Sequence, residues 1–344
     1  MQYMETSQLA ADMGSEVRLL DDAVVFIEAG ASANFDNGGE KTLLQMALHN
    51  GDVNLVEHLL QAGADPNATS NECGSMPLVL AARKQAQEAL VEMLIHARAD
   101  VNASPAEYDG TALQAAVESG NMNIVTMLLK AGADVNASPA KHGCPALQAA
   151  VRSGNVNIMT MLLKAGANVN ASSTEEDRRT ALQAAAASGN QKGVTILLKA
   201  GADVNAPASE VWGNSALQAA VSSGCIAIVE LLIGAGADVN QEPAYKGVAT
   251  ALQFAAIYGY LGIAGLLIEA GADINADAAP KKGRTALEGA AEHGGVAMVE
   301  LLLAAGVETK GAGRAQYLTA IDFARRRGHL VVARMLESHS SRDF

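Results

Sequence analysis

Side chains that could do chemistry are spread thinly along this chain. Its three cysteines, Cys73, Cys144 and Cys225, are odd in number and never stand in a C-x-x-C pair. The seven histidines contain no H-x-x-x-H pair and do not cluster with cysteine, so the sequence predicts no zinc site. The glycines at 311 and 313 lack the following Lys-Ser/Thr of a phosphate-binding loop. We therefore expect no metal and no cofactor.

Large and titratable side chains that could form a site occur closer to the C-terminus. They are Trp212, Tyr245, Ile257, Tyr258, Glu292 and His293. Glu292 or His293 could serve as an acid or a base in catalysis. Tryptophan and tyrosine often anchor protein interfaces, because they bury a large area with few rotatable bonds. Whether these residues meet depends on the elements that hold them.

Residues 110–136, GTALQAAVESGNMNIVTMLLKAGADVN, contain the pattern from which those elements follow. Leu113, Ala116 and Val117 fall on one side of a first short helix, and Ile124 and Leu128 fall on one side of a second. Glycine and asparagine break the pattern between the two helices, and a Gly-Ala-Asp-Val-Asn sequence ends the second. Neither helix offers enough apolar surface to fold alone. The unit therefore needs neighbours.

The neighbours are further copies of the same unit. The leucine of the first helix recurs at a spacing of 34 or 35 residues, as Leu44, Leu78, Leu113, Leu147, Leu182, Leu217, Leu252, Leu287 and finally Ile321. The closing Gly-Ala-Asp or Gly-Ala-Asn, which we call the exit motif, recurs with it. A fixed period of this length over most of the chain predicts one continuous all-α solenoid.

The repeated unit closely resembles the ankyrin repeat family. The family's T-P-L-H-x-A-A signature corresponds to residues 111–116, TALQAA, and its G-A-D-V-N signature to residues 132–136. The resemblance covers roughly residues 39–338 and implies helix-turn-helix units with projecting turns. The units are longer than the family's common length, and glutamine stands where the family usually has histidine, at Gln45, Gln114, Gln148, Gln183, Gln218 and Gln253. We expect this amide to keep a turn-bracing hydrogen bond.

Three segments follow from the repeat boundaries. Residues 1–38 hold a degenerate N-terminal capping repeat, residues 39–310 hold eight repeats, and residues 311–344 hold a C-terminal capping repeat with a polar tail. In the last segment Arg325, Arg326 and Arg327 replace the usual small residues and the exit motif is missing. Charged outer layers are expected where the end of a solenoid meets water.

Charge and hydropathy narrow the possible partners. The formal net charge is −13, from 37 acidic and 24 basic residues, which disfavours nucleic acid or an anionic membrane as a partner. The first residues lack the basic start and apolar core of a secretory signal, and no apolar run approaches the ~20 residues of a membrane span. We expect a cytoplasmic, monomeric protein.

Comparison of the repeats within the chain separates scaffold from recognition. The leucine, the alanines of the first helix and the exit glycine recur from copy to copy. Six of the 37 acidic residues are the repeated aspartate of the second helix's exit, which we expect to brace a turn. The resemblance to ankyrin proteins implies that the turns and the exposed side of the first helix form a concave binding face.

The leading hypothesis is a non-enzymatic interaction scaffold that binds a protein or peptide on this face, through the six large residues above. The turns with Tyr108 and His142 are a further candidate. A small-ligand binder or enzyme with a concave pocket in repeats six to eight stays open as the alternative.

Overall fold

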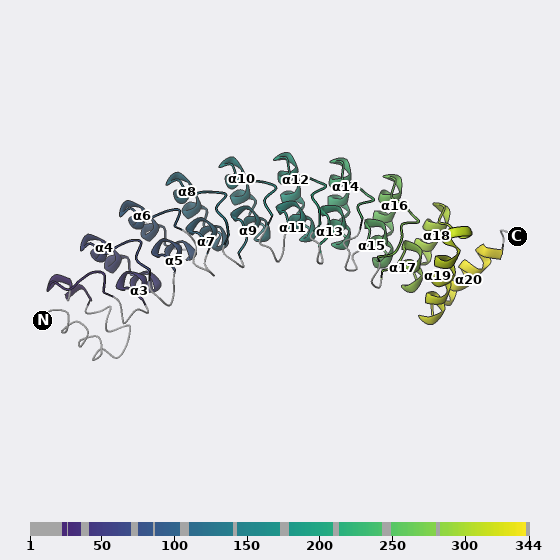
Figure 1. Ribbon diagram of the computed structural model, residues 1–344, viewed down its shortest axis with the longest axis horizontal. Coiled ribbons are helices and arrows are strands. Elements are labelled where there is room, and N and C mark those ends of the chain that lie inside the picture. The colour runs from purple at the N-terminus through teal and green to yellow at the C-terminus, as the bar shows by residue number, and fades with distance from the viewer. Residues whose placement is uncertain are drawn as a thin grey trace. The chain divides into compact units, whose positions relative to one another are not determined.

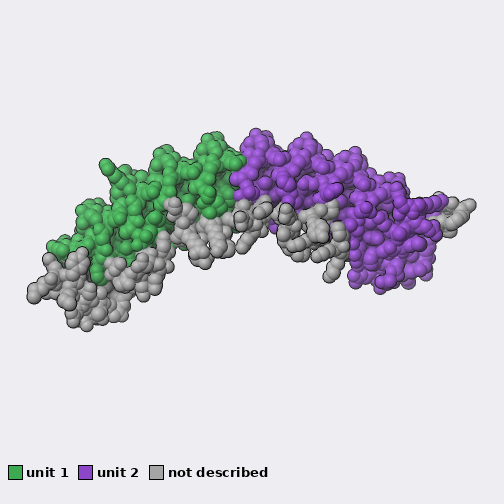
Figure 2. Space-filling model, in the orientation of Figure 1, with its two compact units in different colours: residues 1–168 green, residues 169–344 purple. Residues whose placement is uncertain are grey.

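The computed structural model describes residues 23–25, 27–35, 41–69, 75–84, 87–103, 110–139, 143–172, 179–208, 213–242, 249–279 and 283–341. The chain forms two compact units, residues 1–168 and 169–344, which Figure 2 shows in green and purple. Within the described ranges the regular structure is helical apart from isolated bridge residues, such as the pair Ser172 and Thr180. The predicted all-α architecture is confirmed.

Four complete helix pairs lie in the described part of the first unit (Figure 1). Their bounds are α3 Leu43–Asn50 and α4 Val53–Gln61, α5 Pro77–Arg83 and α6 Glu88–His96, α7 Ala112–Ser119 and α8 Met122–Lys130, and α9 Ala146–Arg152 and α10 Val156–Lys164. In each pair a first helix of seven or eight residues is followed by a second of nine. This is the predicted helix-turn-helix unit.

The second unit continues the same pattern and then departs from it. Its regular pairs are α11 Ala181–Ala187 and α12 Gln191–Lys199, α13 Ala216–Ser222 and α14 Ile226–Gly234, α15 Ala251–Tyr258 and α16 Leu261–Glu269, and α17 Ala286–Glu292 and α18 Val296–Ala304. A short 3-10 turn, η1 Gly311–Gly313, then leads into two longer helices, α19 Arg314–Arg326 and α20 Leu330–Ser341.

Local hydrogen bonds explain where the helices begin and end. At the start of α7 the Thr111 hydroxyl accepts the N–H of Gln114, and the Gln114 side chain accepts the N–H of Thr111 at 2.9 Å, which forms a capping box. Gly120 ends α7 with φ of 74°, a left-handed conformation that costs glycine little. The Asn121 side chain then caps α8 by accepting the N–H of Ile124 at 3.1 Å. The same box opens α3, α11, α13, α15 and α17.

The predicted bond from the substituted glutamine is present. Gln114 Nε2 donates to the carbonyl of Ala137 at 3.1 Å, and Gln218 Nε2 donates to that of Gln241 at 3.1 Å. In these repeats glutamine thus joins the start of the first helix to the segment that leads into the next repeat. Because its carbonyl oxygen completes the capping box at the same time, one side chain serves both elements.

The exit motifs form a ladder of hydrogen bonds from repeat to repeat. Asn102 Oδ1 accepts the N–H of Asp134 in the next repeat at 2.7 Å, and Asn102 Nδ2 donates to the carbonyl of Gly132 at 3.0 Å. Asp134 Oδ1 accepts the N–H of Asn136 at 2.9 Å, so the aspartate braces its own turn as predicted. The second unit repeats the arrangement at Asn205 and Asn240.

The core lies between the layers of helices. The recurring leucine is buried in every described repeat, as at Leu113 and Leu217. Small alanines beside it let neighbouring first helices pack closely. The C-terminal segment is built differently, since α19 begins seven residues before Ile321, whereas α7 begins one residue before Leu113. The extra turns bury Tyr317, whose hydroxyl donates to the carbonyl of Leu336 at 2.6 Å.

Candidate functional site

Helix α15 carries a group of aromatic side chains that is partly open to solvent. Phe254 and Tyr258 stand four residues apart and therefore on one face of the helix; their rings stack in parallel with centroids 6.0 Å apart. Tyr260, which precedes α16, lies 5.7 Å from Tyr258 at a tilt of 35°. Tyr258 is 52% exposed and Phe254 is half-buried. We call these three residues the aromatic cluster.

Two members of the aromatic cluster were not predicted as site residues. The sequence contained a signal for Phe254, because it occupies the position that is alanine in the four preceding repeats, at Ala115, Ala149, Ala184 and Ala219. A large aromatic in a column of alanines has no room between layers and must point toward the surface. Tyr260 offered a weaker signal, since its column already varies from Asn121 to Cys225.

Ile257 acts as a contact between repeats. A Cβ atom added to Gly289 of α17 would lie 2.6 Å from Ile257 Cγ1, so the isoleucine occupies the space that a side chain at 289 would need. This half-buried residue joins α15 to α17. Its large size in a variable column therefore has a packing explanation.

Glu292, at the end of α17, is held by two arginines. Its Oε2 accepts Arg284 Nε at 2.7 Å, and its Oε1 accepts Arg327 Nη2 at 2.7 Å. The hydrogen bond from Arg327 is the largest cause that lowers the pKa of Glu292, against the opposing effect of burial, with Arg284 adding to it. Arg284 also lies 4.3 Å from the ring centroid of Phe323 in α19. The ionised carboxylate of Glu292 thus links the end of α17 to Arg327 at the end of α19.

His293 follows directly and takes part in ending the helix. Its ring Nδ1 lies 3.0 Å from the carbonyl oxygen of Gly289, one turn earlier. The backbone N–H of His293 also donates to the Gly289 carbonyl, at 3.2 Å. Glu292 and His293 therefore both have close partners within α17 and its surroundings.

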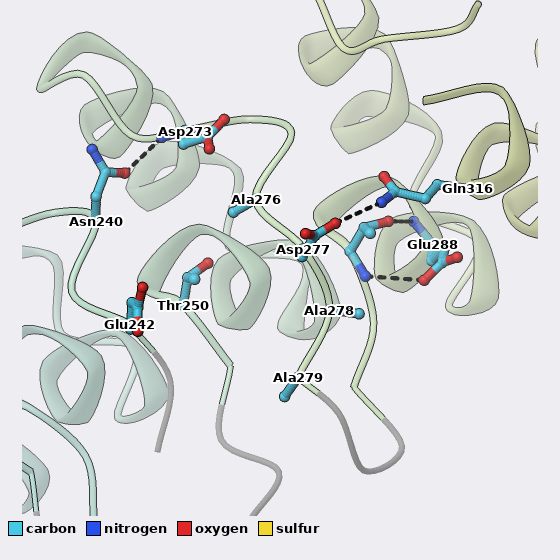
Figure 3. Close-up of a pocket in the computed structure, with 11 residues that line it drawn as sticks. Asn240, Glu242, Thr250, Asp273, Ala276, Asp277, Ala278, Ala279, Glu288 and Gln316 are labelled. Carbon is cyan, nitrogen blue, oxygen red and sulfur yellow. Dashed lines mark hydrogen bonds between the residues drawn. The ribbon is translucent and has the colours of Figure 1, made fainter. Parts of the chain in front are cut away.

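A groove of about 1010 Å³ lies at the amino ends of α15 and α17 (Figure 3). Residues from two exit motifs, two helix starts and α19 line it: Asn240, Glu242, Thr250, Asp273, Ala276, Asp277, Ala278, Ala279, Thr285, Glu288 and Gln316. Tyr258, Glu292 and His293 do not line this groove, since they stand at the opposite, carboxyl ends of the same helices. The groove and the aromatic cluster are separate features of the second unit.

Family comparison agrees with the geometry. The family model described as "Ankyrin repeats (3 copies)" matches the chain in overlapping stretches, at residues 9–105, 43–139, 78–173, 137–208, 171–243, 204–278 and 246–312. The chain is an ankyrin-repeat protein. Ankyrin repeats generally mediate protein–protein interactions, so protein partners are indicated. The comparison with curated proteins gave no match.

The structure of this ankyrin-repeat protein brings together four of the predicted site residues. Ile257 and Tyr258 end α15, and Glu292 and His293 end the adjacent α17. Trp212, Tyr245, Tyr108 and His142 lie outside the described residues.

Two further features are absent from the described part of this ankyrin-repeat protein. No group of three His, Cys, Asp or Glu side chains there is arranged to hold a metal ion. Among the described helices, none combines the length and the apolar character needed to cross a membrane.

Proposed function

We propose that this ankyrin-repeat protein is a non-enzymatic scaffold that binds a protein or peptide partner on the concave face of repeats six to eight. The observation that carries the proposal is the aromatic cluster, in which Tyr258 is 52% exposed beside Phe254 and Tyr260. Tyrosine is enriched among interface residues that dominate binding energy. An exposed, stacked aromatic surface is typical of a docking site for another chain.

The contacts of Glu292 and His293 favour the scaffold over an enzyme that would use them as acid and base. A general acid at neutral pH needs a raised carboxyl pKa, whereas the arginines lower that of Glu292. Both groups also lie outside the groove at the amino ends of α15 and α17. In this proposal the protein works as a cytoplasmic monomer, and its net charge of −13 disfavours nucleic acid as a partner.

The repeats themselves supply the variant that tests the proposal. The alanine of four earlier repeats can replace Phe254, and the serine of Ser119, Ser153, Ser188 and Ser223 can replace Tyr258. In those repeats the serine hydroxyl donates to a carbonyl three residues earlier, at 2.8–3.1 Å. The double variant Phe254→Ala/Tyr258→Ser should therefore fold as the wild type does while losing the aromatic cluster.

Affinity capture from native lysate, quantified by mass spectrometry, would compare this variant with the wild type. We expect a partner recovered by the wild type to bind the double variant at least about 30-fold more weakly, which corresponds to the loss of about 2 kcal/mol typical of an interface hot spot. Met122→Ala, at an exposed apolar residue of the first unit, is the matched control. Equal recovery by wild type and double variant would place the binding site elsewhere.

A further inference from the structure

Glu288 breaks the column of glutamines at the start of the first helices. In five described repeats the glutamine Nε2 donates to a carbonyl of the following segment, at 2.8–3.1 Å: Gln45 to Ser75, Gln114 to Ala137, Gln183 to Ala206, Gln218 to Gln241 and Gln253 to Ala276. Glu288 keeps the capping half of this arrangement, because its Oε2 accepts the N–H of Thr285 at 3.0 Å. Its other oxygen has no donor among the described residues.

This carboxylate is buried and faces the groove at the amino ends of α15 and α17 (Figure 3). Glu288 is only 8% exposed, although it lines a groove of about 1010 Å³. In the five repeats above, the glutamine amide instead donates to a carbonyl of the following segment. At Glu288 the same position presents an acceptor where the other repeats present a donor, so it calls for a donor from outside the repeat.

The remaining walls of the groove suit a long cationic side chain. Ala276, Ala278 and Ala279 provide small apolar surfaces against which an aliphatic stem can lie. Asp277, whose Oδ1 accepts Gln316 Nε2 at 3.1 Å, adds a second carboxylate near Glu288. The described lining residues contain two further acidic groups and neither lysine nor arginine.

We propose that this groove binds an arginine side chain of the partner. Arginine fits better than lysine because its guanidinium carries five N–H donors in a fixed planar fork and is less strongly hydrated than an ammonium. It can therefore donate to the unpaired oxygen of Glu288 and to a neighbouring acceptor such as Asp277. The arginine belongs to the partner of the proposed scaffold, so this inference rests on the proposed function and specifies the chemistry of that partner.

The test uses a small probe, so that it does not depend on knowing the partner. Nα-acetylarginine amide and its neutral isostere Nα-acetylcitrulline amide are titrated into the full chain, and the amide resonance of Thr285, which donates to Glu288, is followed by NMR. We expect the wild type to bind the arginine probe about tenfold more tightly than the citrulline probe, as is typical for hydrogen bonds to a charged group. Glu288→Gln, which restores the residue of the other repeats, should remove this preference.

Two controls make the outcome decisive. Glu300→Gln removes one exposed charge from α18, away from the groove, and should keep the wild-type preference. Phe254→Ala/Tyr258→Ser should keep it as well, because the aromatic cluster does not line the groove. The inference is overturned if the wild type binds both probes equally or not at all, or if Glu288→Gln binds them as the wild type does. The proposed function is judged separately, by partner capture with the aromatic variant.

Discussion

Replacing Gln218 by glutamate would place a carboxylate, like that of Glu288, where a backbone carbonyl needs a hydrogen-bond donor. Gln218 is 1% exposed; its Oε1 accepts the N–H of Ser215 at 2.9 Å and its Nε2 donates to the carbonyl of Gln241 at 3.1 Å. Glutamate has nearly the same shape and can still accept from Ser215. It cannot donate when ionised, so its second oxygen would face the Gln241 carbonyl.

The expected cost follows from those two contacts. Losing one intramolecular hydrogen bond costs about 0.5–1.5 kcal/mol, and leaving the Gln241 carbonyl unsatisfied adds about 1–3 kcal/mol. The capping bond to Ser215 is retained, so no loss is expected there. We predict that Gln218→Glu lowers the free energy of unfolding by about 2–4 kcal/mol at pH 8. Gln218→Ala should lower the free energy of unfolding by a similar amount, because alanine can neither donate to the Gln241 carbonyl nor accept the N–H of Ser215.

The two variants should differ in their dependence on pH. Burial and the facing carbonyl disfavour the charged form, so the pKa of the introduced carboxyl should be raised in the folded state. A group with a raised folded-state pKa is destabilising above that pKa, and the penalty shrinks as the pH falls through it. Once protonated, the carboxyl can donate to Gln241. The difference in stability between wild type and Gln218→Glu should therefore be smaller at pH 6 than at pH 8.

Urea unfolding followed by far-UV circular dichroism measures both effects, and both pH values lie above the sequence isoelectric point near 5.0. Gln218→Ala serves as the control, since the alanine does not titrate and its penalty relative to the wild type should stay constant. A penalty for Gln218→Glu below about 0.5 kcal/mol at pH 8, or one that is the same at both pH values, would refute the donor role of Gln218.

Two further predictions concern the contacts of α17. Glu292→Gln should lower the free energy of unfolding by about 1.5–3 kcal/mol at pH 7, as is typical for hydrogen bonds to a charged group. Because the pKa of Glu292 is lowered in the folded state, this stabilisation is present above the usual carboxyl pKa of 4.5 and is lost as the pH falls through the folded-state pKa. Thermal melts should therefore show a smaller difference between wild type and variant below pH 4 than at pH 7, and a constant difference would contradict the ion pairs with Arg284 and Arg327. Gly289→Ala should lower the free energy of unfolding by about 1–3 kcal/mol, because the added methyl group would overpack against Ile257. The double variant Gly289→Ala/Ile257→Ala should recover part of this stability. A denaturation midpoint for the double variant below that of Gly289→Ala would contradict the contact.

The sequence was most informative where one residue type recurs in one environment. The leucine column predicted both the helix register and the buried positions, because each copy meets the same neighbours. The hydrogen bond of Gln218 and the turn-bracing role of Asp134 followed from the same regularity. Function was harder to predict because it depends on departures from the pattern.

The structural role of a residue that departs from the repeat pattern cannot be predicted from the spacing of the repeats alone. Ile257 is large because Gly289 in the next repeat has no side chain, which is a relation between two columns. Glu292 was predicted as a recognition or acid–base residue, but its ion pair with Arg327 depends on the end of α19, a helix whose early start breaks the repeat register. Glu288 differs from glutamine in one terminal group, an oxygen in place of an NH2, and only the three-dimensional structure reveals the groove beside it.

The ladder of exit motifs also bears on how the chain is made. Its rungs, such as those from Asn102 to Asp134 and from Asn205 to Asp238, join residues 32 or 33 positions apart. A repeat can therefore complete its bonds soon after the next one has left the ribosome, long before the C-terminal helices exist. Contacts of short range along the chain favour fast folding, and a solenoid can add stability one layer at a time. We expect the N-terminal repeats to resist proteolysis while the later repeats are still being synthesised.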